Sequence, residues 1–368
     1  MSRRSVLLGL VALALVLAAA FVLLCAGPRL APAWAQAQQP AAQPAFTGTP
    51  RAPISPPPVE HVLLVGWDGV QRHHLLELMM AGKLPNLWAL IQEGSFETIG
   101  VAGHATDTKS GWTQILTGYD PDVTGVYSNG QYQPIPEGLS IFERAQQAFG
   151  RENVFTMMVN GKAAHVGSIC KGGPTQVAGK QQDEKLGQPF CNTRKALDIW
   201  DGDRGRDAAE VGPAAIAALE KAGGKRLLAF VHFSDPDHRG HAAGENSPEY
   251  EQAIITCDEW LGKLEQWLKD KSLYEKTRVY VVTDHGFDEG GKSHRYAPRS
   301  WLATNDNAVV MGGLMHDIAA TILARMGIDI SKIEPAYPGM ALVDSEPFIK
   351  ERAGRALRPR QRRARLPR

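Results

Sequence analysis

Three short apolar runs, far apart in this chain, each lead directly into an aspartate. Residues 62–67 run into Asp68, residues 227–233 into Asp235-Pro236-Asp237, and residues 279–283 into Asp284-His285. Uninterrupted apolar runs of this length are typical of parallel strands that are buried on both faces of a sheet. The carboxyl ends of such strands share one edge, where α/β proteins bind their ligands. We therefore predict that distant segments bring carboxylates and imidazoles together there, in one or two metal sites.

Helical patterns alternate with these runs. Apolar residues recur at helical spacing in ranges 75–81, 84–91, 109–116, 207–222, 248–268 and 315–326, and a fourth apolar run covers 154–159. Strands that alternate with helices build βαβ units. The sequence therefore predicts an α/β fold, a three-layer αβα sandwich around a mostly parallel central sheet. Its 368 residues and 43% apolar share are enough for such a core.

The two ends of the chain differ in character from the middle. Arg3 and Arg4 precede an apolar run over 6–25, and Ala33-Trp34-Ala35 follows it. This pattern predicts that residues 1–35 are a secretory signal peptide or, because the run could span a bilayer, an uncleaved membrane anchor. We expect a Pro/Ala/Gln-rich linker over 36–58, a catalytic domain over 59–346 and a basic, disordered tail over 347–368. The folded part would then be periplasmic, secreted or tethered to the outer side of a membrane.

The net charge and the cysteines indicate which partners and which cellular compartment to expect. The formal net charge is +1, which gives no reason to expect a nucleic-acid partner. Cys170 and Cys191 bracket a polar insertion over 166–195, and in an oxidising compartment they are natural disulfide partners. Cys257 lies in a helical pattern, which predicts a buried free thiol.

The metal prediction rests on residue types and their spacing. Asp237 and His241 form D-x-x-G-H, where we expect Gly240 to let a loop turn so that both side chains reach one ion. Asp284 and His285 follow a strand end, and His294 comes nine residues after His285 in a Gly-rich loop. A mixed set of imidazoles and carboxylates suits Zn²⁺, whereas a pure oxygen cage would suit Mg²⁺ or Ca²⁺. Each piece alone is weak evidence, because an aspartate after a strand is often only a helix N-cap.

Further residues stand at fixed offsets. Thr108 lies nine residues before Thr117, which precedes a glycine, and 21 residues before Asn129. Together with Asp68-Gly69, the D-x-x-G-H segment and Thr283-Asp284-His285-Gly286, these residues resemble the alkaline phosphatase superfamily, and within it the nucleotide pyrophosphatase/phosphodiesterase branch. The resemblance covers roughly residues 60–330. It implies an alkaline-phosphatase-like fold.

The resemblance also implies a role for each site residue. Thr108 would be the nucleophile and would form a phosphothreonine intermediate. One divalent ion would be held by Asp68, Thr108, Asp284 and His285, and a second by Asp237, His241 and His294. Asn129, and the backbone amide that follows Thr108, would donate to a non-bridging oxygen in the transition state. Lys109 stands where the branch has a bulky residue, and it would either add positive charge near the phosphate or face solvent.

The activity implied is that of an exported two-metal phosphodiesterase acting on a small-molecule or lipid-head-group phosphoester. Neutral Asn129, and the lack of an acidic cluster for a third ion, favour diesters over monoester dianions. Alternatives on the same scaffold are a phosphomonoesterase or sulfatase-like hydrolase, and a transferase that moves a phospho-group to a surface lipid or glycan. A membrane-tethered binding protein with a degenerate site is the alternative from another class. His104 and His316 are the rivals of His294 as a ligand.

Overall fold

A computed structural model describes residues 57–343, apart from 171–174, 178–179, 183–186, 203 and 298. The expected signal peptide or anchor (1–35), nearly all of the linker (36–58) and the basic tail (347–368) lie outside the described residues. Within the described part of the chain, no helix is both long enough and apolar enough to cross a bilayer.

The described residues build one mixed sheet of eight strands in the order β10-β2-β9-β8-β1-β7-β3-β6. Its strands are β1 (His61–Trp67), β2 (Ser95–Gly100), β3 (Val154–Asn160), β6 (Ile199–Asp201), β7 (Arg226–Phe233), β8 (Thr277–Val282), β9 (Arg299–Thr304) and β10 (Gly313–Leu314). β8, β1, β7, β3 and β6 run parallel to one another, and β9 pairs antiparallel with β8 and β2. The prediction of a mostly parallel sheet is confirmed.

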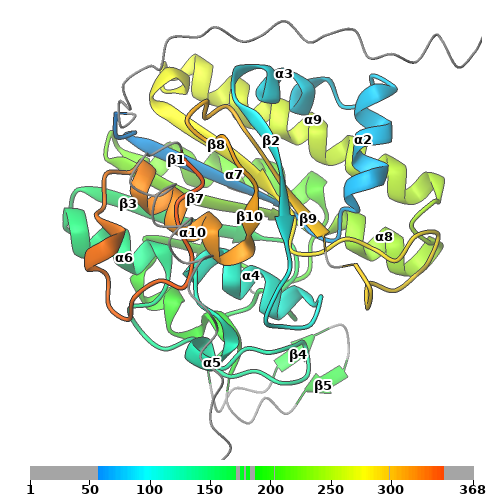
Figure 1. Cartoon of the computed structure of the whole chain (residues 1–368), viewed down its shortest axis with the longest axis horizontal. Coiled ribbons are helices and arrows are strands. Elements are labelled where there is room, and N and C mark those ends of the chain that lie inside the picture. The colour runs from blue at the N-terminus through cyan, green and yellow to red at the C-terminus, as the bar shows by residue number, and fades with distance from the viewer. Residues whose placement is uncertain are drawn as a thin grey trace, which may run out of the picture. The chain divides into compact units, whose positions relative to one another are not determined.

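Helices cover both faces of this sheet (Figure 1). One face packs against α4 (Thr108–Thr117), α6 (Ile141–Phe149) and α10 (Met315–Arg325). The other packs against α2 (Arg72–Met80), α3 (Pro85–Glu93), α7 (Ala208–Leu219) and α9 (Pro248–Asp270). The sequence of β1 is apolar throughout because both of its faces are buried: Leu64 points into the first core and Leu63 into the second. The three-layer αβα sandwich is therefore confirmed.

Shorter elements connect these layers. Among the described residues these are α5 (Pro121–Thr124), α8 (Asp235–Ala243) and 3-10 helices at Pro189–Cys191, Thr193–Ala196, Glu220–Ala222, Tyr274–Lys276 and Ile330–Lys332. The polar insertion holds a small antiparallel pair, β4 (Thr175–Val177) and β5 (Lys180–Gln182). The predicted disulfide between Cys170 and Cys191 is present, and Cys257 is a buried free thiol as expected.

One local expectation was wrong. The segment from Asp237 to His241 is not a loop but part of helix α8, which begins two residues after β7 ends. Asp237 and His241 still share a face, because residues four apart are neighbours on a helix. Gly240 does not form a turn either. A Cβ atom there would lie 2.6 Å from Cζ of Phe287, so the glycine lets the helix pack directly against that ring.

The candidate site residues gather at one edge of the sheet, where the parallel strands end. β8, β1, β7 and β3 are neighbours and run parallel, so their carboxyl ends meet. Asp68 follows β1, α8 follows β7, and Asp284 and His285 follow β8. Lys162 follows β3 at the same edge.

Candidate metal centre and active site

The first group of possible ligands lies between β1 and β8. Side-chain atoms of Asp68, Asp284 and His285 all lie within 4.8 Å of one another, and all three residues are buried. The hydroxyl of Thr108, the first residue of α4, is 3.4 Å from Nε2 of His285. Four residues predicted to share an ion thus come together from three distant segments.

The turn after β1 holds this group in place. Gly69 has φ +68, a left-handed conformation that favours glycine. Its amide donates to Oδ1 of Asp284 at 3.1 Å, which ties β1 to the end of β8. A Cβ atom at Gly69 would lie 2.9 Å from Cβ of Asp237, so a side chain would push the two ligand groups apart.

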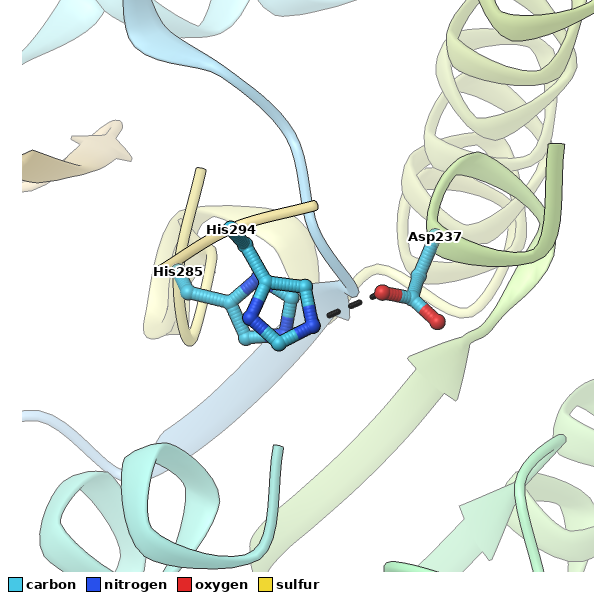
Figure 2. Close-up of side chains that lie close together, drawn as sticks. All are labelled: Asp237, His285 and His294. Atoms are coloured by element: carbon cyan, nitrogen blue, oxygen red, sulfur yellow. Dashed lines mark ion pairs between the residues drawn. The ribbon is translucent and has the colours of Figure 1, made fainter. Parts of the chain in front are cut away.

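The second group faces the first. Asp237, His285 and His294 bring one ligand atom each to within 4.8 Å of the others (Figure 2). His241 joins them, with its Nε2 atom 3.3 Å from Oδ1 of Asp237. His285 belongs to both groups, so the two candidate ion positions are neighbours.

Backbone carbonyls orient two of the imidazoles. Nδ1 of His285 lies 3.0 Å from the carbonyl oxygen of Gly286, and Nδ1 of His241 lies 2.9 Å from that of Lys292. A carbonyl oxygen only accepts, so each Nδ1 carries a proton, which leaves Nε2 of His285 to present a lone pair. The hydrogen bond from His241 to Asp237 raises the pKa of His241. Burial lowers the pKa of His285 to about 4, so this imidazole is neutral at pH 7. A neutral imidazole held in this way is the form that a metal ion binds.

Unsatisfied polar atoms indicate that these residues fit cations. Oδ2 of Asp284 and Nδ1 of His294 are buried and have no hydrogen-bond partner among the described residues. Burial, together with the neighbouring carboxylate of Asp68, raises the pKa of Asp284 well above its usual range. Buried polar atoms are normally paired, so the cluster is short of positive charge and of electron-pair acceptors. Divalent ions would supply both.

A lysine that the sequence analysis missed lies between the two groups. Nζ of Lys162 is 2.6 Å from Oδ2 of Asp237, 3.1 Å from Oδ1 of Asp68 and 3.0 Å from Oγ1 of Thr108. Burial opposes ionisation of both carboxyls, but this ammonium holds the pKa of Asp68 and Asp237 below their usual range. A signal was available, because Lys162 comes soon after the apolar run 154–159, with Asn160 and Gly161 between them.

A second missed residue, His232, lies inside strand β7. Its Nε2 atom is 3.0 Å from Oδ2 of Asp68, and its side chain is fully buried. The ring packs edge-on against Trp112 of α4 at 5.0 Å. His232 therefore fixes the rotamer of Asp68. A single imidazole in an apolar strand is more often a core residue than a functional one, so the sequence alone gave no reason to select it.

Asn129 is held beside the start of α4. Its backbone amide donates to Oδ2 of Asp107 at 2.9 Å, and its Oδ1 accepts from the backbone amide of Lys109 at 3.0 Å. With Oδ1 committed as an acceptor, the remaining polar group of this side chain is the NH₂ donor. The backbone amide that was expected to contact phosphate is therefore engaged by Asn129 instead.

Lys109 is 4% exposed, so it does not face solvent. Its ammonium lies 3.2 Å from the carbonyl oxygen of Asn129 and 3.3 Å from the centre of the Tyr132 ring. These contacts brace the Asn129 backbone.

A cavity of about 520 Å³ opens above this cluster. Its lining includes Thr108, Asn129, Lys162, His165, His238 and His294. Burial lowers the pKa of His165 to about 3, so this imidazole is neutral at pH 7. The nucleophile candidate, a neutral donor and several imidazoles thus share one space that could admit a small ester.

The two rivals of His294 lie elsewhere. His104 Nε2 contacts Oε1 of Gln114 at 3.0 Å, and His316 Nδ1 contacts Oδ1 of Asp120 at 3.1 Å. Neither histidine belongs to the ligand groups found among the described residues. Of the three candidates, the structure brings His294 to Asp237.

Two curated proteins are similar in sequence to about two thirds or more of this chain. GPI ethanolamine phosphate transferase 1 of Mus musculus is 23% identical over 250 residues, which are 66% of this chain and 26% of that protein. Ectonucleotide pyrophosphatase/phosphodiesterase family member 1 of Mus musculus is 25% identical over 276 residues, 72% of this chain and 28% of that protein. The chain thus spans about a quarter of the length of these relatives.

Solved structures share the fold. A variant of the alkaline phosphatase of the Antarctic bacterium TAB5, with Mg bound in its M3 site, superimposes with a TM-score of 0.52 at 13% identity. The match covers 74% of this chain and 99% of that one. The phosphonate monoester hydrolase SpPMH from Silicibacter pomeroyi gives 0.50 at 16% identity over 82% and 78%. Identities this low show the alkaline phosphatase-like fold alone.

The family itself is identified by sequence. Residues 62–348 match the model of the type I phosphodiesterase / nucleotide pyrophosphatase family, which is well over half of the chain and includes every candidate ligand. The chain belongs to the type I phosphodiesterase / nucleotide pyrophosphatase family.

Proposed function

We propose that this protein is an exported, metal-dependent enzyme that cleaves phosphodiester bonds with Thr108 as its nucleophile. One observation carries the proposal. The Thr108 hydroxyl lies at the start of α4, 3.4 Å from Nε2 of His285, and His285 belongs to both ligand groups. Cations bound at these groups would place positive charge beside the phosphoryl group that Thr108 attacks.

Two zinc ions are the expected cofactors. Asp68, Thr108, Asp284 and His285 would hold one, and Asp237, His241 and His294 would hold the other. The mixed carboxylate and imidazole donors favour zinc over magnesium. When bound, the ions would lower the pKa of the Thr108 hydroxyl and offset charge on the phosphoryl oxygens.

The reaction of the chain's own residues has two halves. Oγ1 of Thr108 attacks phosphorus in line, the bond to one alcohol breaks, and that alcohol leaves with a proton. The resulting phosphothreonine keeps the second ester group. Water then attacks the same phosphorus, the bond to Oγ1 breaks, and a phosphomonoester is released. The NH₂ group of Asn129 would donate to a non-bridging oxygen in both transition states, a role supported by the hydrogen bond from Lys109 N that commits its Oδ1 as an acceptor.

Transfer rather than hydrolysis is the second candidate. The observation that favours it is the similarity to a protein named GPI ethanolamine phosphate transferase 1. In that case an alcohol on a lipid or glycan would replace water in the second half. The cavity of about 520 Å³ could admit either a small-molecule ester or a lipid head group. A phosphomonoesterase or sulfatase-like activity on the same scaffold is the remaining hydrolase alternative.

Export is supported by two features. The disulfide between Cys170 and Cys191 is of the kind that persists in oxidising compartments. The charged and then apolar N-terminal residues 1–35 fit a signal peptide or membrane anchor. The site would then lie in the periplasm, in the medium or on the outer side of a membrane.

A substrate screen coupled to metal analysis tests the proposal. Protein purified after zinc-replete growth is assayed with aryl phosphodiester, phosphomonoester and sulfate ester, with and without a lipid or glycan acceptor. We expect the diester to give the highest kcat/KM and chelation to abolish it. Faster cleavage of the monoester would favour the phosphomonoesterase alternative. Product formation only with acceptor would favour transfer, and no turnover of any ester would favour a binding protein.

A further inference from the structure

The ammonium of Lys162 contacts both ligand groups and the nucleophile at once. It lies 2.6 Å from Asp237 Oδ2, 3.1 and 3.2 Å from the two oxygens of Asp68, and 3.0 Å from Oγ1 of Thr108. The side chain is 7% exposed. Lysine is almost never buried to this degree unless it is paired, so the contacts are specific.

The backbone that carries Lys162 is firmly anchored. Oδ1 of Asn160 accepts from the Lys162 amide at 3.2 Å, and Nδ2 of Asn160 donates to the carbonyl of Val166 at 2.9 Å. Arg206 donates to the carbonyl of Asn160 at 3.0 Å, and its own amide donates to the carbonyl of Gly161 at 2.9 Å. The base of the side chain is therefore fixed, while its four-carbon stem leaves the ammonium free to change partners.

Metal binding would force such a change. In the present arrangement the Lys162 ammonium is the shared cation of three buried carboxyl groups, those of Asp68, Asp237 and Asp284. Two divalent cations at these carboxylates would compete with the ammonium for the same oxygens and repel it. Lys162 also lines the cavity of about 520 Å³, together with Asn129 and His165, so the ammonium has room to move into this cavity.

We propose that Lys162 is a catalytic residue whose ammonium leaves Asp68 and Asp237 when metal binds and donates to a non-bridging oxygen of the phosphoester at Thr108. The inference rests on the proposed function. Its geometric basis is the distance of 3.0 Å between Nζ and Oγ1. Phosphorus bonded to Oγ1 carries its other oxygens one bond further out, within reach of a group at that distance.

The formal charges then match a diester. Two divalent ions and Lys162 would bring five positive charges, and three carboxylates, the Thr108 alkoxide and a diester would bring five negative ones. A monoester dianion would leave one negative charge over among the groups that touch the reacting atoms.

Three variants of the full zinc-loaded chain test the role. Lys162→Met removes the charge and keeps the length, Lys162→Arg keeps the charge, and Lys276→Met removes an exposed lysine paired with Glu60 as a matched control. The measurements are zinc content, the Kd of inorganic phosphate by calorimetry, and kcat/KM for an aryl phosphodiester. Lys162→Met should bind two zinc ions, weaken phosphate binding about tenfold and lower kcat/KM by about 10²-fold, the scale of one lost charge-stabilising donor. Lys162→Arg should fall between it and wild type, and Lys276→Met should match wild type.

Thermal unfolding gives a readout that does not depend on turnover. Without metal, Lys162→Met should unfold at a lower temperature than wild type, because three buried carboxylates lose their shared cation. Zinc should close most of that gap, since the ions then neutralise the same groups. A gap that stays equal with and without zinc would mean that the side chain only fills space, and would overturn the proposal.

Other outcomes are equally clear. Wild-type phosphate affinity and turnover in zinc-loaded Lys162→Met would overturn the proposal, as would equal impairment of the Arg and Met variants. If Lys162→Met does not fold, Lys162→Arg becomes the decisive variant. Phosphate binding and turnover of Lys162→Arg within tenfold of wild type would support the role, and loss of both with zinc bound would refute it.

Thr108→Ala, assayed in parallel, separates the inference about Lys162 from the proposed function. If it is inactive while Lys162→Met is unimpaired, only the inference about Lys162 fails, whereas an active Thr108→Ala removes the proposed function.

Discussion

The imidazole ring of His294 stacks on that of His285, with 4.0 Å between the ring centres and 27° between the planes. His285 lies three residues after the end of strand β8, whereas His294 comes from the loop that leads to β9. The stack sets both rings on one side of the space they share with Asp237, as Figure 2 shows. The stacking contact therefore holds His294 in place although it comes from a loop.

Replacing His294 should therefore remove one ion and leave the other. We expect His294→Ala to retain about one zinc per chain, because Asp68, Asp284 and His285 remain, and to lose activity by at least about 10²-fold. Elemental analysis of the purified variant measures this. The matched control is His316→Ala, which removes an imidazole bound to Asp120 instead and should keep two ions. Two ions in His294→Ala, or one in His316→Ala, would contradict the assignment.

Thr108→Ala should abolish turnover while the protein remains folded. The change removes a small polar side chain from the first residue of α4, so helix packing is little affected. Thr108→Ser should keep part of the activity, because the hydroxyl survives. Steady-state kinetics on both variants is the measurement. Activity of Thr108→Ala within about tenfold of wild type, or about 1.4 kcal/mol of barrier, would rule out the nucleophile role.

The disulfide should stabilise the fold without taking part in catalysis. Cys170 and Cys191 are 21 residues apart, and the chain-entropy estimate for closing such a loop is about 3 kcal/mol. The double variant Cys170→Ala, Cys191→Ala should lose about that much free energy of unfolding in denaturant titrations and should no longer respond to reductant. Its zinc content should stay at the wild-type value. Equal stability of the variant and the oxidised wild type would contradict the prediction.

The contribution of one carboxyl far from the metal centre to stability should fall as pH rises. Glu265 of α9 is 4% exposed and lies 3.6 Å from Lys269, and burial raises its pKa to about 7. A folded-state pKa above the unfolded value of 4.5 means that the full contribution is present below about pH 4.5 and is lost as pH rises through 7. Glu265→Gln, which cannot ionise, should be more stable than wild type at pH 8 by about 2 to 3 kcal/mol.

The two proteins should differ little at pH 5, so denaturant titrations at both pH values measure the effect. Glu259→Gln on the same helix is the control, because that side chain is exposed. It should show no such change with pH. A Glu265→Gln curve parallel to wild type from pH 5 to pH 8 would show that the buried carboxyl is not ionising in this range.

The strands that carry the ligands could be predicted because both of their faces are buried. β1, β7 and β8 are apolar over nearly their whole length, which marks them in the sequence without any knowledge of their partners. β2 could not be recognised in this way, since Ile99 is its only fully buried residue. Its place in the sheet comes from pairing with β9, a contact between segments about 200 residues apart.

The same distinction applies to the site. Asp68 and Asp284 could be predicted because each directly follows an apolar run. Lys162 follows one too, but its importance depends on β3 lying next to β7, and the order of strands is a tertiary fact. The sequence around Asp237 predicts a loop rather than a helix, because Asp, Pro and Gly are common in turns. Proline is well tolerated in the first turn of a helix, which is where Pro236 lies.

The central claim, that Thr108 and then water attack the same phosphorus, is tested most directly by stereochemistry. A phosphodiester made chiral at phosphorus with sulfur is hydrolysed in isotopically labelled water, and the configuration of the product is determined. Each in-line displacement inverts phosphorus, so a phosphothreonine intermediate predicts overall retention. Overall inversion would show that water attacks the ester in a single step, and would contradict the role assigned to Thr108.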